Sequence, residues 1–572
     1  MKGTEANTYD AIVVGTGISG GWAAMELCRA GLKTLVLERG RAIPHGDYPT
    51  ANLDTWELPY QDQVPTGERD AHYSVLQRKD YLLRQHAKHH FVRDDAYPYT
   101  EKRRFDWFRG YHTGGRSLMW GRQCYRLSDL DFEANARDGI AVDWPIRYAD
   151  LKPWYDHVSR FVGISGQREN LRQLPDGPFL PAMPLNCVEE VVRDRVRAAF
   201  PARHVTPGRA AHLTAYDPGV HLGPRGSCQY RNRCVRGCPY GGYFASNSST
   251  LPVAEETGNL TLLHHAAVRQ VIFDADAGRA TGVAVKRTDT NEEVEFFSRG
   301  VIFLNASTLN TAGILLASKS RTQPNGLGNN HDQVGRHLMD HHHKITISGE
   351  MDGFTDRIDK GRKPNGFYIP RFVNLGDRAS KRDYLRGFGY QGGASRDGWW
   401  RLVRETAVRP GPELKEQLLT PGNWSVGMTA FGESLPDPGN RVTLNEEKVD
   451  QDGLPTLVLD AAFGENEARM RDDMGPAGAE MLEAAGAKNV RISRAEAHPG
   501  FSIHEMGTAR MGRDRETSVL NAHNQLWDCP NVYVTDGSAM TSAACVNPSL
   551  TYMALTARAV DHAVGELKRG NL

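Results

Sequence analysis

The sequence lacks the features that would take a chain into a membrane or onto a strongly charged partner. No apolar run in its 572 residues approaches the length of a membrane span. Its 69 Lys and Arg residues balance its 69 Asp and Glu residues, so we expect no nucleic-acid partner. Met1–Thr8 shows no basic segment leading into an apolar core, and we therefore expect no export signal in the chain itself.

Cysteine is scarce and unevenly placed. Of the eight cysteines, Cys228, Cys234 and Cys238 share one short segment. An odd cluster of three is a poor basis for disulfide pairing and favours a metal site. Three thiolates can each hold one iron, so the simplest prediction is a 3Fe–4S cluster.

Other ligand sets for the cysteine segment remain open. A 4Fe–4S cluster would need a remote fourth ligand such as Cys187 or Cys124. Zinc would need His221 as its fourth ligand, at a spacing that matches no common zinc site. Three free thiols in a loop are the remaining alternative.

The N-terminal stretch has the pattern of a dinucleotide-binding unit. Ala11–Val14 is a short apolar run that predicts a buried parallel strand, and it leads into Gly15-x-Gly17-x-x-Gly20. A helical stretch and a second strand follow, and that strand ends at Glu38. In such a unit the glycines form the turn, admit a pyrophosphate and let the helix pack closely, while the acid hydrogen-bonds a ribose. This stretch alone does not separate FAD from NAD.

A second glycine-rich segment occupies residues 110–121. It contains Gly114, Gly115 and Ser117, and paired glycines beside a serine let a backbone close around a flat ligand. A block with Trp144-Pro145, Tyr148 and Asp150-Leu151 follows it.

The C-terminal end holds the candidate chemistry. His504 precedes a turn with two glycines, which suits a side chain projected into a cavity, although an isolated histidine is more often a packing residue. Val532–Val534 predicts a strand that ends at Asp536-Gly537, a good place to meet a cofactor. Asn547-Pro548 then begins a long helix.

These segments together resemble the glucose–methanol–choline (GMC) oxidoreductases, which are FAD enzymes that oxidise alcohols. The resemblance implies that Gly114, Gly115 and Ser117 lie over the flavin, that Val268 lies near the adenine and that Asp536-Gly537 contacts FAD. It also implies that FAD is held noncovalently, because Met119 stands where some members tether FAD through a histidine.

The resemblance further places His504 and Asn547 as the pair that faces the flavin. These residue types suit the reaction. A neutral imidazole can take the proton of an alcohol, and an amide can stabilise the developing alkoxide. Hydride would then pass to the flavin N5.

The expected fold is α/β, with a Rossmann-like FAD-binding domain and a second domain built on an antiparallel sheet. We expect residues 1–42, 106–155, 205–343 and 496–572 to form the FAD domain, with 226–242 as its iron–sulfur segment. Residues 43–105 are expected to form an arm or lid, and 156–204 with 344–495 the substrate domain.

Several local expectations accompany this division. Leu260–His264, Val268–Phe273 and Thr281–Arg287 alternate like antiparallel strands, and Glu465–Ala485 has helical spacing. His341–His343 looks like a metal tract, but consecutive histidines in a strand point to opposite faces, so we interpret it as structural. Aromatic residues of the substrate domain could stack on a sugar ring or simply pack: Tyr368, Tyr390, Trp399, Trp400 and Trp424.

The resulting interpretation is an FAD-dependent sugar dehydrogenase with an iron–sulfur relay. The cysteine segment and the His/Asn pair look most like the large subunit of a bacterial glucoside 3-dehydrogenase, which implies oxidation at C3 of glucose or a glucoside. Glucose or gluconate dehydrogenase, acting at C1 or C2, is the second candidate. An oxygen-using pyranose or alcohol oxidase and a non-catalytic electron carrier remain as alternatives.

The resemblance also implies partners. These are a small subunit that carries an export signal and a c-type cytochrome or quinone that accepts the electrons. The expected location is therefore periplasmic, by export together with that subunit and with possible attachment to the membrane through it.

Overall fold

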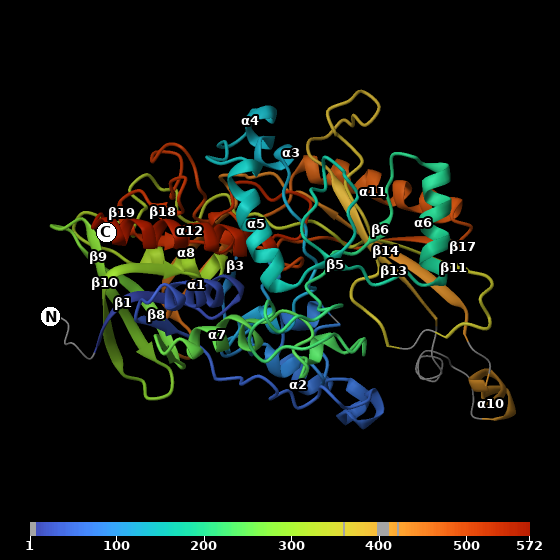
Figure 1. Cartoon of the computed structure of the whole chain (residues 1–572), viewed down its shortest axis with the longest axis horizontal. Helices are drawn as coiled ribbons and strands as arrows, with labels where there is room; N and C mark the ends of the chain where they lie inside the picture. The colour runs from blue at the N-terminus through green and yellow to red at the C-terminus, as the bar shows by residue number, and fades with distance from the viewer. Residues whose placement is uncertain (1–6, 80, 359–360, 397–410, 420–421) are drawn as a thin grey trace.

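The computed structural model describes residues 7–79, 81–358, 361–396, 411–419 and 422–572. Two sheets dominate these residues, and they lie side by side along the long axis of the molecule (Figure 1). The first contains the N-terminal strands, and the second contains β11 (Ile345–Met351), β13 (Phe388–Arg396) and β14 (Trp424–Gly432). This confirms the predicted class, a Rossmann-like region joined to a region built on an antiparallel sheet.

The first sheet begins with the predicted strand–helix–strand unit. Strand β1 (Thr8–Val14) leads into helix α1 (Ile18–Arg29), and β2 (Thr34–Leu37) returns parallel to β1. On the other side of β1 lie β10 (Glu293–Leu304) and then β19 (Cys529–Val534), both parallel to their neighbours. Because parallel strands end at one edge of a sheet, the turns after β1, β2, β10 and β19 meet there.

One prediction about this sheet is wrong. The sequence pattern suggested that Leu260–His264 pairs in antiparallel fashion, but β7 (Leu260–Leu263) runs parallel to β2. The chain reaches β7 through helix α7 (Thr250–Glu256), and such a crossover permits parallel pairing. The antiparallel expectation holds for β8 (Ala266–Asp274) with β9 (Arg279–Arg287).

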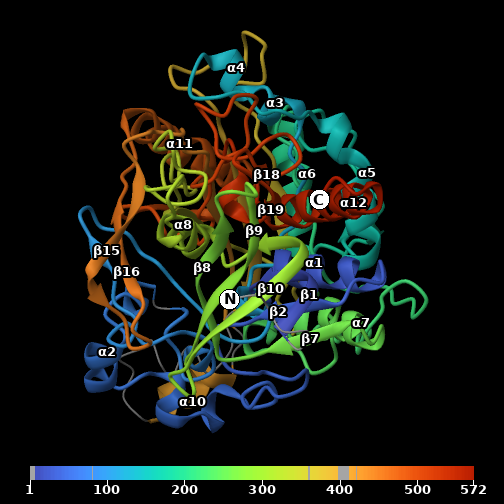
Figure 2. The ribbon, with the colours of Figure 1, turned by 90° about the vertical axis from the view of Figure 1, so that its left-hand side faces the viewer.

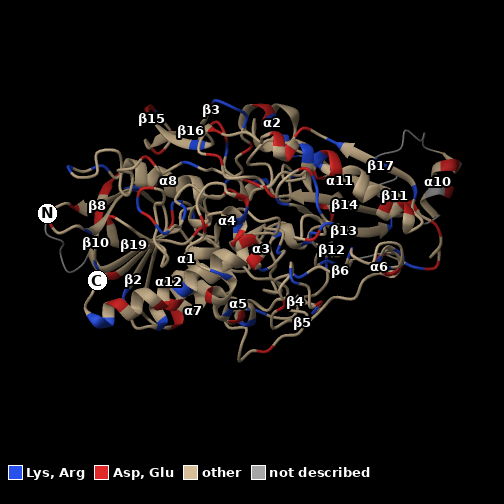
Figure 3. Cartoon of the chain, turned by 90° about the horizontal axis from the view of Figure 1, so that it is seen from above, with Lys and Arg blue, Asp and Glu red and all other residues tan. Residues whose placement is uncertain are grey.

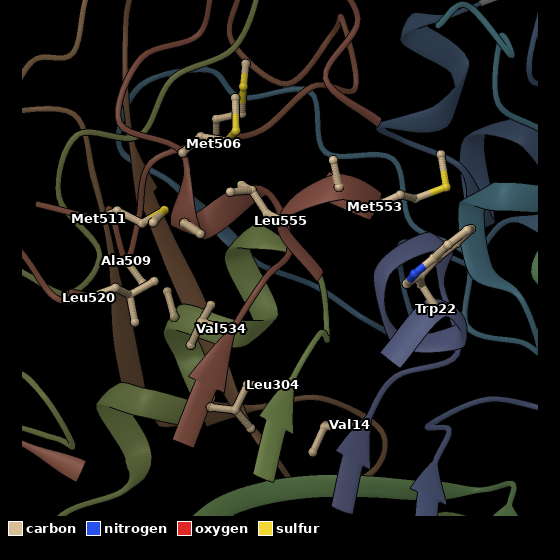
Figure 4. Packing of buried hydrophobic residues seen from close by; sticks show 14 of the residues in the cluster. Val14, Trp22, Leu304, Met506, Ala509, Met511, Leu520, Val534, Met553 and Leu555 are labelled. Carbon is tan, nitrogen blue, oxygen red and sulfur yellow. The ribbon is translucent and has the colours of Figure 1, made fainter. Parts of the chain in front are cut away.

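Helices cover this sheet and close the core. Helix α12 (Ser549–Arg569) packs against α1 and α5 (Tyr148–Val162), whereas α8 (Thr308–Ala317) contacts β8 on the other side. Figure 2 shows α12 and α5 on one side of the sheet and β15 (Arg441–Val449) and β16 (Pro455–Asp460) on the other. The buried Val14, Leu304 and Val534 lie at the ends of β1, β10 and β19 (Figure 4).

The second sheet has the strand order β17-β11-β14-β13-β12-β6. Its central strands are β11 (Ile345–Met351), β14 (Trp424–Gly432) and β13 (Phe388–Arg396), all antiparallel. On β14, buried and half-buried residues alternate, which is the pattern of a sheet packed on one face. Helices α11 (Glu465–Ala484) and α6 (Cys187–Ala199) contact the sheet, and α11 ends within one residue of its predicted end.

Residues 441–460 lie apart from this second sheet. Strands β15 (Arg441–Val449) and β16 (Pro455–Asp460) pair with β3 (Thr100–Glu101) in a sheet of their own, and β15 contacts α8. Strand β6 (Thr206–Pro207) in turn joins the second sheet. In both places the structure divides the chain differently from the predicted domains.

The remaining elements are short. They are α2 (Thr66–His72), α3 (Asp129–Phe132), α4 (Ala134–Asp138), α10 (Pro412–Leu419), β4 (Ser165–Gly166), β5 (Leu180–Pro181), β12 (Phe367–Ile369), β17 (Lys488–Arg494) and β18 (Gln525–Leu526). The predicted arm, residues 43–105, holds α2, β3 and several 3-10 helices. Its Leu76 and Leu82 pack in an apolar cluster with Phe108 and Phe501, which lie outside the arm.

Two global features agree with the composition. Acidic and basic residues are interspersed along the chain rather than gathered in one block (Figure 3). Among the helices of the described residues, none is both long and apolar enough to cross a membrane.

Candidate active site

A cavity joins the glycine turn after β1 to the C-terminal segments. Its walls include Gly15, Gly17 and Glu38 at one end and His504 and Asn547 at the other. The other predicted cofactor residues that line it are Gly115, Ser117, Val268, Asp536 and Gly537. The structure therefore gathers around one space residues that are more than 500 positions apart in the sequence.

The three glycines of the first turn have different surroundings. A Cβ on Gly15, which has φ +96°, would lie 2.4 Å from the Asn305 carbonyl oxygen, and a Cβ on Gly20 would lie 2.0 Å from the Gly15 oxygen. A Cβ on Gly17 would meet no atom within 4 Å. Gly15 and Gly20 thus permit close packing of the turn, whereas Gly17 keeps its edge of the cavity open. Of the three glycines in this turn, Gly20 does not line the cavity.

Glu38 is fixed at the end of β2 by its own neighbours. One carboxylate oxygen accepts from the Gly40 amide at 2.9 Å, and the other accepts from the amide and hydroxyl of Thr16. Burial raises the pKa of Glu38. A carboxylate oxygen has room for a further hydrogen bond, so Glu38 fits the predicted ribose contact.

The second glycine-rich segment covers the first turn. The Gly114 amide donates to the Thr16 hydroxyl at 2.9 Å, although Gly114 itself does not line the cavity. The Ser117 hydroxyl donates to the Gly114 carbonyl at 2.6 Å, which closes the segment into a compact turn. Met119 lines the cavity at the position where a histidine would be needed for a covalent link.

His504 lies between two polar neighbours. Its Nδ1 lies 2.9 Å from Nδ1 of His341, and its Nε2 lies 3.2 Å from Nδ2 of Asn547. The Asn547 Oδ1 accepts in turn from Nε2 of Gln391 at 2.6 Å. Gln391 belongs to β13, so the second sheet supports a residue at the end of the FAD cavity.

The backbone around this pair is strained. Ile503, directly before His504, has φ +61°, and Ala544, before Asn547, has φ +56°. A β-branched residue in the left-handed region is a genuine outlier, and such strain persists only where surrounding contacts fix it. One such contact comes from Asp340, whose Oδ1 accepts from the His504 amide at 3.0 Å.

The surroundings of His504 hold it in the neutral form. Burial lowers the pKa of His504 well below its ordinary value of 6.5, and the nearby His341, Lys79 and Arg116 lower it further. Arg116 is itself paired with Glu505 at 2.8 Å. A neutral imidazole at the end of a cavity has the protonation state that a general base needs.

Asp536 and Gly537 follow β19, as predicted. One Asp536 oxygen accepts from the Ser538 amide at 3.0 Å and the other from the Thr311 hydroxyl at 2.6 Å. The buried Asn305, directly after β10, also lines the cavity, and its side-chain nitrogen has no hydrogen-bond partner among the described residues. An unpaired amide donor beside the glycine turn suits a phosphate or ribityl oxygen. The residues around the cavity therefore fit FAD.

The cysteine segment packs next to the second glycine-rich segment. Cys234 and Cys238 pack on an apolar cluster that includes Leu118 of that turn, and Tyr243 hydrogen-bonds the Leu118 carbonyl. Burial, with a smaller contribution from the two other thiols, raises the pKa of Cys228 to about 11. Within the described ranges no group of three metal-ligating side chains is assembled. The thiols are thus neighbours in one loop, without the geometry of a formed ligand set.

The structure describes three of the five aromatic residues that were expected to stack on a sugar, and none of these three lines the cavity. Tyr390 donates to the Met474 carbonyl at 2.6 Å, Tyr368 stacks on Tyr125, and the Trp424 indole donates to the Phe354 carbonyl. These three are buried packing residues. Trp399 and Trp400 lie outside the described residues.

The predictions from the sequence omitted His341, Gln391 and Arg116. His341 was noticed only as part of the histidine tract, which is not a regular strand, so the argument from alternating strand faces does not apply to it. Gln391 carries no signal in the sequence, because its role depends on how the second sheet meets the C-terminal segment.

Two family models, each described as GMC oxidoreductase, match residues 9–343 and 436–556. The 2-methyl-1,2-propanediol dehydrogenase of Mycolicibacterium austroafricanum is 27% identical over 570 residues, which cover 98% of this chain and 96% of that protein. The fructose dehydrogenase large subunit of Gluconobacter japonicus is 23% identical and covers 99% of both chains. A formate oxidase of Aspergillus oryzae RIB40, solved to study modification of its FAD, has a TM-score of 0.58 at 15% identity, covering 99% of this chain and 100% of that one.

Proposed function

The chain belongs to the GMC oxidoreductase family, and from that premise we propose that it is an FAD-dependent dehydrogenase that oxidises a secondary hydroxyl of a sugar. The proposed position is C3 of glucose or a glucoside, and the product is a 3-keto sugar. The family supports FAD and the oxidation of CH–OH groups; the sugar, the carbon and the electron acceptor are our proposals.

The observation that carries the proposal is the pair of His504 and Asn547 at the end of the cavity opposite Glu38. A hydroxyl that enters between Nε2 and Nδ2 meets a base for its proton and a donor for its oxygen. His504 takes the proton, and the Asn547 amide stabilises the charge that develops on oxygen. Bound FAD supplies the acceptor for the carbon-bound hydrogen, which leaves as hydride.

The choice of a sugar rests on two arguments. A full-length relative at 23% identity is a fructose dehydrogenase large subunit. The segment Cys228-x-Tyr-Arg-Asn-Arg-Cys234, together with the His/Asn pair, resembles glucoside 3-dehydrogenases. The second candidate is oxidation at C1 or C2, as in glucose or gluconate dehydrogenases.

Product analysis tests the substrate. The FAD-loaded protein is incubated with glucose and with methyl glucoside in the presence of an artificial electron acceptor, and the products are identified by NMR. We expect a C3 ketone from both sugars. A lactone would indicate oxidation at C1 and a 2-keto product oxidation at C2, and either would contradict the C3 assignment. If neither sugar is oxidised, the sugar assignment is wrong.

We further propose that electrons leave through an iron–sulfur cluster held by Cys228, Cys234 and Cys238. The packing of Cys234 and Cys238 near Leu118, in the turn that covers the flavin, supports this route. Ligation requires the loop to close around the cluster, because the three thiols are not yet gathered at one point.

Iron and acid-labile sulfide analysis of purified protein tests the cluster, with a Cys234→Ser variant as control. We expect about three irons per chain in the wild type. Iron-free protein that consumes oxygen and forms peroxide during turnover would instead identify an oxidase with structural cysteines.

The proposed acceptor is a c-type cytochrome or a quinone, and the proposed partner is a small subunit whose export signal takes both chains to the periplasm. Reduction of cytochrome c in the presence of sugar, but not in its absence, tests the acceptor. Fractionation of cells that express the chain with and without a candidate small subunit tests the location.

A further inference from the structure

We propose that His341 is a positioning residue that fixes the single proton of His504 on Nδ1 and thereby leaves Nε2 free to act as the base. The inference rests on the proposed function and deepens it. It concerns the histidine tract, which the sequence suggested to be purely structural.

The surroundings of His341 determine where its own proton lies. Its Nε2 faces two backbone carbonyl oxygens, those of Ala543 at 3.2 Å and Ala544 at 2.9 Å. A carbonyl oxygen only accepts hydrogen bonds, so Nε2 must carry a proton. His341 is buried, and burial lowers its pKa to about 4, so the ring is neutral and its Nδ1 is an acceptor.

The next step follows from the contact between the two rings. Nδ1 of His341 lies 2.9 Å from Nδ1 of His504, and only one proton fits between them. Since the His341 nitrogen accepts, the His504 nitrogen donates. A neutral His504 with its proton on Nδ1 has a lone pair on Nε2.

The contacts of Nε2, on the opposite side of the His504 ring, lead independently to the same assignment. Gln391 donates through Nε2 to Oδ1 of Asn547, which turns the Asn547 amide nitrogen toward His504. That nitrogen is a donor, and it faces Nε2 of His504 at 3.2 Å. Nε2 must therefore be an acceptor in the resting site, as the His341 argument also requires.

The carboxylate of Asp340 fixes the backbones of both His341 and His504. Asp340 Oδ1 accepts from the backbone amides of His341 at 2.9 Å and His504 at 3.0 Å. Asp340 Oδ2 accepts from the Ser502 amide at 3.0 Å, and the Ser502 hydroxyl donates to the His341 carbonyl at 2.6 Å. Because Asp340 and Ser502 hold the backbones of both histidines, the two rings keep a fixed position relative to each other.

This arrangement has a consequence during the reaction. When the substrate proton moves to Nε2, His504 becomes an imidazolium whose Nδ1–H still points at His341. The hydrogen bond to His341 then becomes charge-assisted and stabilises the cation. His341 accepts that bond without taking the proton, in the way that an aspartate orients the histidine of a hydrolase triad.

The test compares two substitutions at position 341. His341→Asn keeps an acceptor near the position of Nδ1, whereas His341→Leu removes it at similar volume. In anaerobic stopped-flow mixing with sugar, we expect His341→Leu to slow flavin reduction by about 10²-fold or more, with KM little changed. We expect His341→Asn to remain within about 10-fold of the wild type.

His342→Met is the matched control in the same tract. His342 is buried and does not line the cavity, and its ring lies against the backbone of Glu433 and the ring of Phe463, so His342→Met leaves the contact between His341 and His504 in place. We expect a normal rate of flavin reduction. Equal losses in His341→Leu and His341→Asn, or no loss in either, would overturn the proposal.

A second readout does not depend on turnover. Histidine-selective 15N spectra of the flavin-free wild type, assigned with a His504→Ala variant, report which ring nitrogen carries the proton. We expect an unprotonated Nε2 in His504, and a protonated Nε2 contradicts the inference even if His341→Leu fails to fold. If the wild type oxidises no alcohol, the proposed function fails while this spectrum still decides the tautomer.

Discussion

The two ends of the cavity are built in different ways. The end at Gly15 and Glu38 is made from one continuous strand–helix–strand unit, and mainly from its backbone. The end at His504 is made from side chains of four separate segments, which contribute His341, Gln391, His504 and Asn547. Backbone shape can be recognised from spacing in the sequence, whereas a side-chain network exists only after the segments have packed. In the proposed function, the first end binds FAD and the second end carries out the reaction.

The largest effect is expected from a side chain on Gly17, which would fill the binding end of the cavity. A Cβ there meets no protein atom within 4 Å, so Gly17→Val leaves packing intact while filling the edge of the cavity. We expect a folded protein that has lost FAD and with it all sugar oxidation, as measured by flavin absorbance and circular dichroism. Gly67→Val, on the exposed helix α2, is the control and should retain FAD. Full FAD content in Gly17→Val would show that this turn is not the nucleotide site.

The reacting end is probed by Asn547→Ala. Loss of the amide removes a donor to the developing alkoxide, and we expect kcat to fall by roughly 10²- to 10³-fold. FAD content should not change, because the Gly15 turn and Glu38 are untouched. Steady-state kinetics with flavin quantification checks both parts. A loss confined to KM would assign Asn547 to ground-state binding instead.

Glu38→Gln tests how much the binding end contributes to FAD affinity. The charged carboxylate contributes a stronger hydrogen bond to a ribose than an amide does, so we expect FAD affinity to fall by roughly 10- to 100-fold. The turnover rate at saturating FAD should equal that of the wild type. Titration of flavin-free protein with FAD measures the affinity, with the exposed Glu255→Gln as control. Unchanged affinity would remove Glu38 from the cofactor site.

The smallest effect concerns pH. His504 must be neutral to act, and its pKa lies well below 6.5 because the ring is buried near other cationic groups. A lowered pKa keeps a histidine unprotonated at lower pH, so kcat/KM should stay level from about pH 8 down to 6.5 and fall only below that. An acid limb centred above pH 6.5 would contradict the proposed environment of the base.

The same contrast between the two ends of the cavity explains which features could be predicted from the sequence. It predicted the Gly15 turn, Glu38, the two regions and the pairing of His504 with Asn547, because strands, turns and family motifs are local patterns. It mispredicted the direction of β7, since a short alternating run does not specify its partner strand. It missed His341 and Gln391 because their roles arise where the histidine tract and β13 meet the C-terminal segment.

The most direct test of the account removes the base alone. FAD-loaded His504→Ala is mixed anaerobically with methyl glucoside, and flavin reduction is followed in a single turnover beside the wild type. We predict that the variant keeps its FAD and reduces it about 10²- to 10⁴-fold more slowly. Flavin reduction at the wild-type rate in His504→Ala would contradict the assignment of this end of the cavity as the site of chemistry.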